Sequence, residues 1–331
     1  MLRWKLLRAA SPVAVLAALA LALAGPARAQ GAEEKFTNLK VLPKDISPAE
    51  LRGMMNGFTR ALGVRCIYCH VGQEGKPFQH DDFAKDDKLT KTKARAMLAM
   101  VHDINENYLA KIDSRAEPPV KVECFTCHRG GQLPRTLQDA LLTAYDGGGL
   151  DSTEARYNSL KDRYYGRATY DFGDVPLGDV SQKLRMEGHD DDALALAKLN
   201  VDMNPKSAFA KRQHANTTLV LAYRKGAPAG AAAYADLKTR YGPTVVNEDM
   251  LVNVGYEMLG EKHADTAIEA FKLVVAENPN SSNGYDSLGE AYLAHGDKKL
   301  ARAAYQQSLK LDPTNDNAKA KLDEIAGKKK K

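Results

Sequence analysis

Cysteine and tryptophan are scarce in this sequence of 331 residues. It has four cysteines, all in two short motifs, and a single tryptophan, Trp4. Signals of common enzyme classes are also lacking. The sequence shows no Ser-His-Asp setting, no glycine loop that would cradle a phosphate, and no carboxylate pair that stands apart from the charge of helix surfaces. We therefore predict no catalytic residues of these classes.

A long apolar run is missing as well. The run from Pro12 to Gly25 is shorter than the ~20 residues that a membrane-spanning helix needs. It follows three basic residues and precedes Ala27-Arg28-Ala29, a small-x-small cleavage site. This pattern predicts a secretory signal peptide over residues 1–29 and no transmembrane span in the mature chain. We expect a periplasmic protein, with a cell-surface or extracellular location as the alternative.

The predicted mature chain lacks a large excess of positive charge. The formal charge is +5, and removal of residues 1–29 takes away four basic residues and no acid, which lowers the charge to +1. Residues 328–331 are all lysine, so the remaining body is slightly acidic. This distribution argues against a nucleic-acid-binding surface. We expect residues 326–331 to be a solvated basic tail.

The four cysteines lie in two similar motifs. "VRCIYCHVG" covers residues 64–72 and "VECFTCHRG" covers 122–130, and each places a histidine directly after a C-x-x-C pair. Export would permit disulfides. A zinc site is a second alternative, but 54 residues separate Cys69 from Cys124, whereas paired zinc motifs usually stand ~15–20 residues apart. A thioredoxin-type dithiol would need a βαβ setting that the sequence lacks.

None of these alternatives uses the histidines, whereas attachment of a c-type haem uses all three residues of each motif. The two thiols form thioethers with the vinyl groups, and the imidazole binds the iron. The sequence therefore predicts two covalently attached c-type haems. The residues predicted to hold them are Cys66, Cys69 and His70 for the first, and Cys124, Cys127 and His128 for the second.

We expect the second axial ligand of each iron to lie on the helix that precedes the motif. Ser47 and Glu50 form a capping box with proline at the first helical position, and this predicts a helix that ends before a turn at Gly63. A second helix is predicted over 92–110. The apolar face of the first is Leu51, Met55, Phe58 and Leu62, and that of the second is Met97, Met100, Val101, Ile104 and Tyr108.

Superposing the two helices puts Met55 and Met97 in equivalent places, and we predict both as axial iron ligands. Methionine on a helix is more often a core residue, and that alternative stays open. Met54, Met100 and His102 also remain candidates for this role.

These segments resemble the cytochrome subunit of photosynthetic reaction centres. "ALGVRCIYCHVG", and "ARAMLAMVHDIN" followed by "VECFTCHRGG", carry the resemblance, which covers residues 38–134. That family builds each unit from a methionine helix, a turn and a C-x-x-C-H helix. The resemblance implies Met55 opposite the haem of His70 and Met97 opposite the haem of His128.

The sequence also departs from that family. The photosynthetic subunit carries four haems, and this chain has motifs for two. One haem of the family takes a histidine from the turn after the second methionine helix, and "YLAKIDS" has none. We therefore expect a dihaem relative that serves another electron-transfer chain.

The C-terminal half repeats itself with a period of 34 residues. Tyr285, Leu288, Gly289, Tyr292, Ala301, Tyr305 and Pro313 are matched 34 residues earlier by Leu251, Val254, Gly255, Met258, Ala267, Phe271 and Pro279. The pattern resembles tetratricopeptide repeats, which predict a solenoid of three to four helical hairpins. Such domains commonly bind partner proteins or peptides in a groove.

Together these features predict an all-α protein with five segments. They are a signal peptide (1–29), a dihaem cytochrome c domain (30–135), a helical connector (136–187), a tetratricopeptide-like repeat domain (188–325) and a basic tail (326–331). The predicted function is transfer of single electrons between redox partner proteins, with the repeats for docking. A dihaem peroxidase-like oxidoreductase and a haem-based redox or gas sensor are the alternatives.

Overall fold

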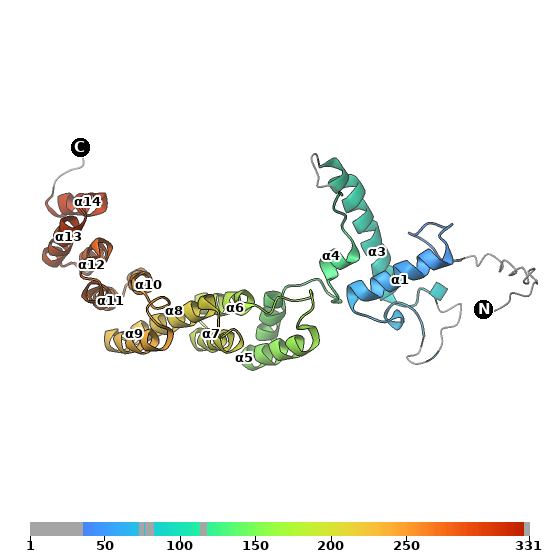
Figure 1. Ribbon diagram of the computed structural model, residues 1–331, viewed down its shortest axis with the longest axis horizontal. Coiled ribbons are helices and arrows are strands. Elements are labelled where there is room, and N and C mark those ends of the chain that lie inside the picture. Colours follow the sequence, from blue (N-terminus) through green and yellow to red (C-terminus); the bar gives the residue numbers. More distant parts are fainter. Residues whose placement is uncertain (1–35, 73–75, 77–82, 113–117, 328–331) are drawn as a thin grey trace, which may run out of the picture. The chain divides into compact units, whose positions relative to one another are not determined.

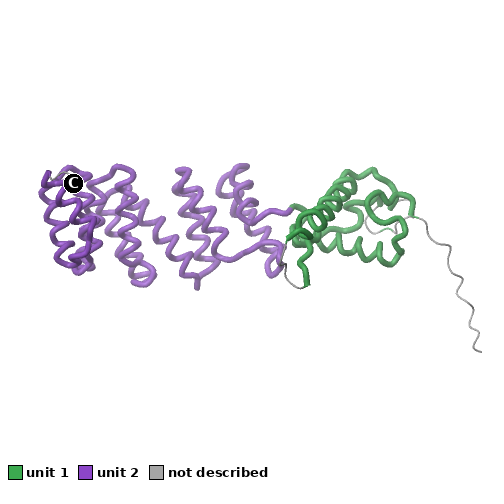
Figure 2. The backbone as a smooth tube through the Cα atoms, turned by 90° about the horizontal axis from the view of Figure 1, so that it is seen from above, with its two compact units in different colours: residues 1–133 green, residues 134–331 purple. Residues whose placement is uncertain are grey.

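A computed structural model describes residues 36–72, 76, 83–112 and 118–327. Every regular element among these residues is helical, which confirms the predicted all-α class. They divide into two compact units, residues 1–133 and 134–331 (Figure 2). No helix in the described part of the chain is long and apolar enough to cross a membrane. The predicted signal peptide and Lys328 to Lys331 lie outside the described residues.

Unit 1 begins with the helix that the capping box predicted. Helix α1 (Pro48–Leu62) has Ser47 as its N-cap, and the Ser47 hydroxyl accepts from the Glu50 N–H while the Glu50 carboxylate accepts from the Ser47 N–H. The helix ends at Gly63, whose φ of 64° lies in the left-handed region that favours glycine. Both predicted ends of this helix are therefore confirmed.

The second methionine helix changes its winding partway. It consists of α3 (Leu89–Asp103), the π-helical turn η2 (Ile104–Tyr108) and the 3-10 turn η3 (Leu109–Lys111). Within η2, the Asn105 amide donates to the carbonyls of Val101 (2.9 Å) and Val122 (2.8 Å), and its oxygen accepts from the Val122 N–H (2.9 Å). One side chain thus joins this helix to the segment that precedes Cys124.

The two halves of unit 1 meet where glycines allow the backbones to touch. After α4 (Cys124–His128) the Gly130 N–H donates to the Ala61 carbonyl at 2.8 Å. A Cβ atom on Gly63 would lie 2.2 Å from the Gly130 oxygen, which is closer than any side chain permits. The contact therefore fixes the end of α1 against the second cysteine motif (Figure 1).

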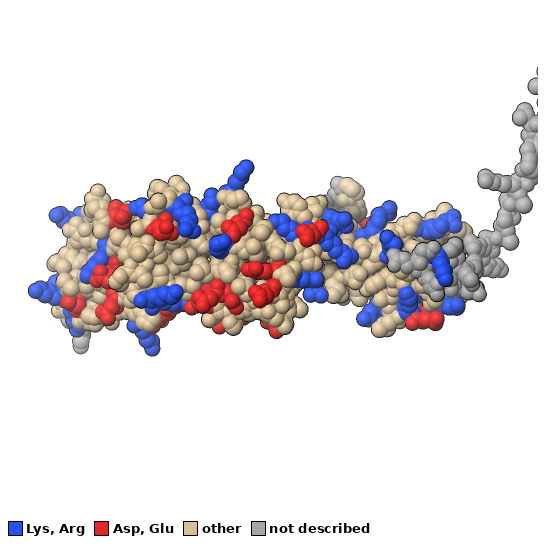
Figure 3. Space-filling model, turned by 90° about the horizontal axis from the view of Figure 1, so that it is seen from below, with Lys and Arg blue, Asp and Glu red and all other residues tan. Residues whose placement is uncertain are grey.

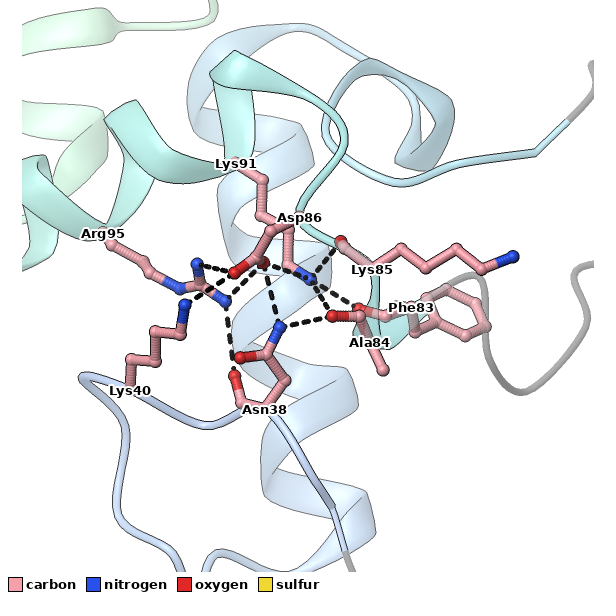
Figure 4. Close-up of polar contacts among 8 residues, drawn as sticks. All are labelled: Asn38, Lys40, Phe83, Ala84, Lys85, Asp86, Lys91 and Arg95. Atoms are coloured by element: carbon pink, nitrogen blue, oxygen red, sulfur yellow. Dashed lines mark hydrogen bonds and ion pairs between the residues drawn. The ribbon is translucent and has the colours of Figure 1, made fainter.

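Asp86 holds the N-terminal segment of unit 1 to α3 (Figure 4). Its carboxylate forms ion pairs with Lys40 (2.8 Å), Lys91 (3.2 Å) and Arg95 (2.8 Å), and it accepts from the Asn38 amide (2.9 Å). The Arg95 guanidinium, together with Lys40 and Lys91, holds the pKa of the Asp86 carboxyl well below its usual range.

Unit 2 starts with α5 (Leu137–Tyr164), which breaks at Gly148 and Gly149. Both halves of α5 contribute buried side chains to one apolar cluster with α6 (Asp174–Met186) and α7 (Asp190–Met203). Tyr157 is fully buried there and its ring meets the edge of Phe172 at a centroid distance of 5.9 Å. This aromatic pair is part of the core of unit 2.

The rest of unit 2 is a series of antiparallel helical hairpins (Figure 1). Helix α6, from the segment predicted as a connector, pairs with α7, and three further pairs and a last helix follow. Their bounds are α8 (Ala208–Arg224), α9 (Ala227–Tyr241), α10 (Glu248–Gly260), α11 (Ala264–Glu277), α12 (Ser282–His295), α13 (Lys298–Leu311) and α14 (Asp316–Ile325).

Equivalent glycine and aromatic pairs close successive hairpins. A Cβ atom on Gly255 would lie 2.6 Å from the Phe271 ring, and one on Gly289 would lie 2.8 Å from the Tyr305 ring. Phe271 and Tyr305 are both fully buried. The period of 34 residues predicted from these residues is thus a packing period: each aromatic ring of a second helix lies against a glycine of the first helix.

The surface of unit 2 carries both signs of charge. On the face that Figure 3 shows, acidic and basic side chains are interspersed along the hairpins, and that face has no broad area of one sign. Several pairs are spaced for helix-surface ion pairs, such as Lys183 with Glu187 and Lys198 with Asp202. Such pairs contribute little to stability, which leaves the buried hairpin contacts as the main stabilising interactions.

We predict that Gly255→Ala destabilises unit 2 by ~1–3 kcal/mol, because the new methyl group overlaps a buried ring that has no room to move. The matched control is Gly260→Ala at the end of the same helix, where a Cβ meets nothing within 4 Å. That change should be neutral or stabilising by ~0.5–1 kcal/mol. Urea unfolding followed by circular dichroism measures both, and equal effects would contradict the packing role.

A second prediction concerns Asp86. Because its pKa is lowered in the folded chain, the carboxylate stabilises the fold above the ordinary aspartate pKa of ~3.9, and this contribution is lost as the pH falls below it. Asp86→Asn should speed amide exchange in residues 38–44 at pH 7, and the difference from wild type should shrink below pH ~4. Asp87→Asn is the control, since Asp87 is exposed. A pH-independent difference would refute the ionic origin.

Candidate haem-binding site

The first cysteine motif lies on a tight turn after Gly63. The 3-10 turn η1 (Cys66–Tyr68) puts Cys66 and Cys69 three residues apart on one side of the backbone. Cys66 is exposed and Cys69 is partly buried. The Nδ1 atom of His70 is buried and has no hydrogen-bond partner among the described residues, and the His70 ring meets the edge of Phe83 at 5.2 Å.

The second motif forms a short helix. In α4, Glu123 is the N-cap, and its side chain accepts from the Thr126 N–H while its own N–H donates to the Thr126 hydroxyl. Nδ1 of His128 lies 3.1 Å from the Gly131 carbonyl oxygen, which can only accept. Nδ1 therefore carries the proton, which leaves Nε2 with a free lone pair. This is the tautomer that an iron-ligating histidine needs.

The predicted methionines are on the two long helices of unit 1. Met55 in α1 is partly buried, and Met97 in α3 is 42% exposed. The alternative candidates are similarly accessible: Met54 is partly buried, Met100 is 45% exposed and His102 is exposed. All of these side chains are accessible enough to contact a group outside the protein core.

Unit 1 leaves its apolar side chains partly or fully exposed. Of its described hydrophobic residues only Ala61 is buried, at 3% exposed, whereas unit 2 contains three buried apolar clusters. The exposed apolar side chains of unit 1 are Val41, Phe83, Leu89, Met97, Met100, Tyr108, Ile112, Val120, Phe125 and Leu133. Such surfaces mark contact with an apolar partner. Helices that present apolar faces beside two C-x-x-C-H motifs fit a large apolar macrocycle.

The two predicted haem segments are brought together within unit 1. The second motif lies against the end of α1 through Gly130 and Ala61. The first motif lies against the start of α3, where the Lys88 ammonium donates to the Ile67 carbonyl and the Thr90 hydroxyl donates to the Tyr68 carbonyl at 2.5 Å. Each methionine helix thus contacts the motif of the other segment.

The other interpretations of the cysteines fit this geometry less well. All four cysteines are free thiols, and no three His, Cys, Asp or Glu side chains of the described residues gather as a metal site would require. Burial raises the pKa of the Cys69 and Cys124 thiols. A redox-active dithiol needs the opposite shift, because the thiolate is the reactive form.

Several residues that organise this unit were not predicted. Asn105, Asp86 and Lys88 act through contacts with segments 17 to 48 residues away in the sequence. Asn105 gives one sequence signal, since asparagine is a poor residue for a helix interior. Asp86 and Lys88 give none, because charged residues near the start of a helix are common.

Comparison with known families supports this site. The family model of the photosynthetic reaction centre cytochrome C subunit matches residues 15–150, and a tetratricopeptide repeat model matches residues 282–315. The chain is 33% identical over 108 residues to the photosynthetic reaction center cytochrome c subunit of Roseobacter denitrificans, and 32% identical over 106 residues to that of Thermochromatium tepidum. These alignments cover 32% and 31% of this chain but only 27% and 23% of the relatives.

Solved structures resemble unit 2 more weakly. The MamA protein covers 54% of this chain and 90% of its own at 18% identity, with a TM-score of 0.29. YrrB, described as a tetratricopeptide-repeat protein with an unusual peptide-binding site, covers 56% and 89% at 10% identity, with a TM-score of 0.30. The repeat assignment rests instead on the hairpins and the family match.

Taken with the geometry, these matches show that the N-terminal part of the chain resembles the cytochrome subunit of photosynthetic reaction centres, and that its C-terminal part is built of helical hairpins, one of which matches the tetratricopeptide repeat.

Proposed function

We propose that this protein is an exported dihaem c-type cytochrome that carries single electrons between protein partners. The observation that carries the proposal is the pairing of two C-x-x-C-H motifs in one unit whose described apolar side chains, apart from Ala61, are partly or fully exposed. The family match supports covalently bound haem. The number of haems, the axial ligands and the export are part of the proposal.

Each residue of the site has a defined task. Cys66 and Cys69 would tether the first haem and Cys124 and Cys127 the second, and His70 and His128 would bind the irons. When bound, a haem supplies an iron that changes its charge by one electron. Met55 and Met97 would each bind one iron as its second axial ligand. A thioether ligand favours the ferrous state, and an iron with six ligands has no position for a substrate.

The repeats supply a surface for a partner. A cavity of about 430 Å³ opens between α6, α8 and α10, and side chains from all three first helices line it. Among its lining residues, Arg212, Asn216 and Asn253 form no hydrogen bond or ion pair with the described part of the chain. Carboxamide and guanidinium groups that lack internal partners can bind peptide amides and carboxylates. We infer that a partner protein docks here.

The haem proposal is tested by producing the full chain in a host that matures c-type cytochromes. We expect a pyridine haemochrome count of two haems per chain. Met55→Ala and Met97→Ala should each convert one haem from low spin to high spin and remove part of the charge-transfer band of thioether-bound ferric iron.

Met54→Ala and Met100→Ala are the matched controls and should leave both haems low spin. A chain that carries no haem would refute the proposal. Binding of carbon monoxide by the isolated wild-type protein would show an open axial position and would favour the peroxidase or the gas sensor instead.

Export is tested on the same material. The mature chain should begin at Gln30, and its mass should lack residues 1–29. Ala29→Arg should block processing, because the cleavage site requires a small residue, whereas Ala32→Arg beyond the cut should be processed normally. Intact-mass spectrometry of periplasmic and cytoplasmic fractions distinguishes these outcomes. Unprocessed wild-type chain in the cytoplasm would contradict the proposal.

A further inference from the structure

The start of α3 places positive charge directly on the first cysteine motif. The Lys88 ammonium donates to the carbonyl of Ile67, and the Thr90 hydroxyl donates to the carbonyl of Tyr68. Ile67 and Tyr68 are the two residues between Cys66 and Cys69. The Lys88 ammonium is thus hydrogen-bonded to the backbone between the two thiols.

Two more cations follow along the same helix. The Lys91 ammonium donates to the carbonyls of Phe83 (2.8 Å), Ala84 (3.0 Å) and Lys85 (2.7 Å) (Figure 4). The Phe83 ring in turn contacts His70. The side chains of Lys91 and Arg95 are only 12% and 16% exposed. Salt screens partly buried charges much less than exposed ones, so their field persists at physiological ionic strength.

Among the described residues, one carboxylate faces this positive charge. Asp86 pairs with Lys91 and Arg95, and it also pairs with Lys40, so it faces three cations. Lys88 contacts the first motif directly, and Lys91 holds the backbone of Phe83, whose ring contacts His70. In the described part of the chain, the first motif therefore lies beside more cations than carboxylates.

The second motif has a different environment. Glu123 caps α4 and is the residue directly before Cys124, so a carboxylate lies beside the second motif. Each motif has one flanking arginine, Arg65 before the first and Arg129 after the second, so these two charges do not distinguish the motifs. The difference lies in the cations of α3 at the first motif and the carboxylate at the second.

Resting on the proposed function, we infer that the haem at Cys66, Cys69 and His70 has the higher reduction potential, and that Lys88 is the residue that raises it most directly. Reduction adds one negative charge to the haem, so a nearby cation stabilises the ferrous state and a nearby carboxylate the ferric state. Electrons would then move from the second haem to the first, which gives the dihaem unit a direction.

The test is a spectroelectrochemical titration of the full-length dihaem protein, which should resolve two one-electron waves. Lys88→Gln keeps a donor for Ile67 but removes the charge. It should lower the midpoint potential of the upper wave. At a fixed applied potential, the ratio of reduced to oxidised haem at that site should therefore fall by roughly threefold to tenfold. The lower wave should not move. Glu123→Gln, which retains a capping group, should raise the lower wave only.

Lys93→Gln is the matched control, because Lys93 is an exposed residue of the same helix. It should shift neither wave. A variant with Cys124→Ser and Cys127→Ser, which retains only the first haem, should keep the upper wave and its response to Lys88→Gln, and this assigns the wave to a motif.

The inference is overturned if Lys88→Gln moves neither wave, moves the lower wave, or moves both equally. The haemochrome count is taken before each titration. A chain without two haems would therefore overturn the proposed function, whereas two haems with unshifted waves would overturn this inference alone.

Discussion

Burial of apolar side chains is the constraint that separates the two units of this protein. Unit 2 buries its apolar side chains internally, in three apolar clusters, and in two of its hairpins a glycine of the first helix packs against a ring of the second. Unit 1 does not, since only Ala61 among its described hydrophobic residues is buried. Its order depends instead on polar and backbone contacts such as those of Asn105, Asp86 and Gly130. A polypeptide of this kind is suited to enclose an apolar cofactor rather than a core of its own.

Local signals in the sequence predicted the local structure well. The capping box at Ser47 and the left-handed glycine at Gly63 are both short-range effects of residue type, and both are present. The period of 34 residues predicted the hairpins because it records contacts between neighbouring helices. The start of the repeats was harder to predict, since α6 lacks the residues that mark the later copies.

Contacts between distant segments could not be predicted in the same way. Asp86 forms ion pairs with Lys40, Lys91 and Arg95, but residues of these types are also common on solvated helix faces. The π-helical turn at Ile104–Tyr108 depends on Asn105 meeting Val122, a contact that only the folded chain creates. The sequence could predict the haem-attachment residues because thioether chemistry requires a fixed spacing, and they remain a prediction. The methionine assignments depend on which helix faces which motif, and spacing alone does not determine that.

The close approach of Gly63 and Gly130 has a consequence for electron exchange. At this point the two halves of unit 1 meet through main-chain atoms, with the Gly130 N–H bonded to the Ala61 carbonyl at 2.8 Å. A contact between backbones has no rotamers, so side-chain motion does not change its length. In the proposed dihaem unit, the tunnelling distance would be set by the backbone, and surface residues could change during evolution to suit new partners without altering the internal transfer step.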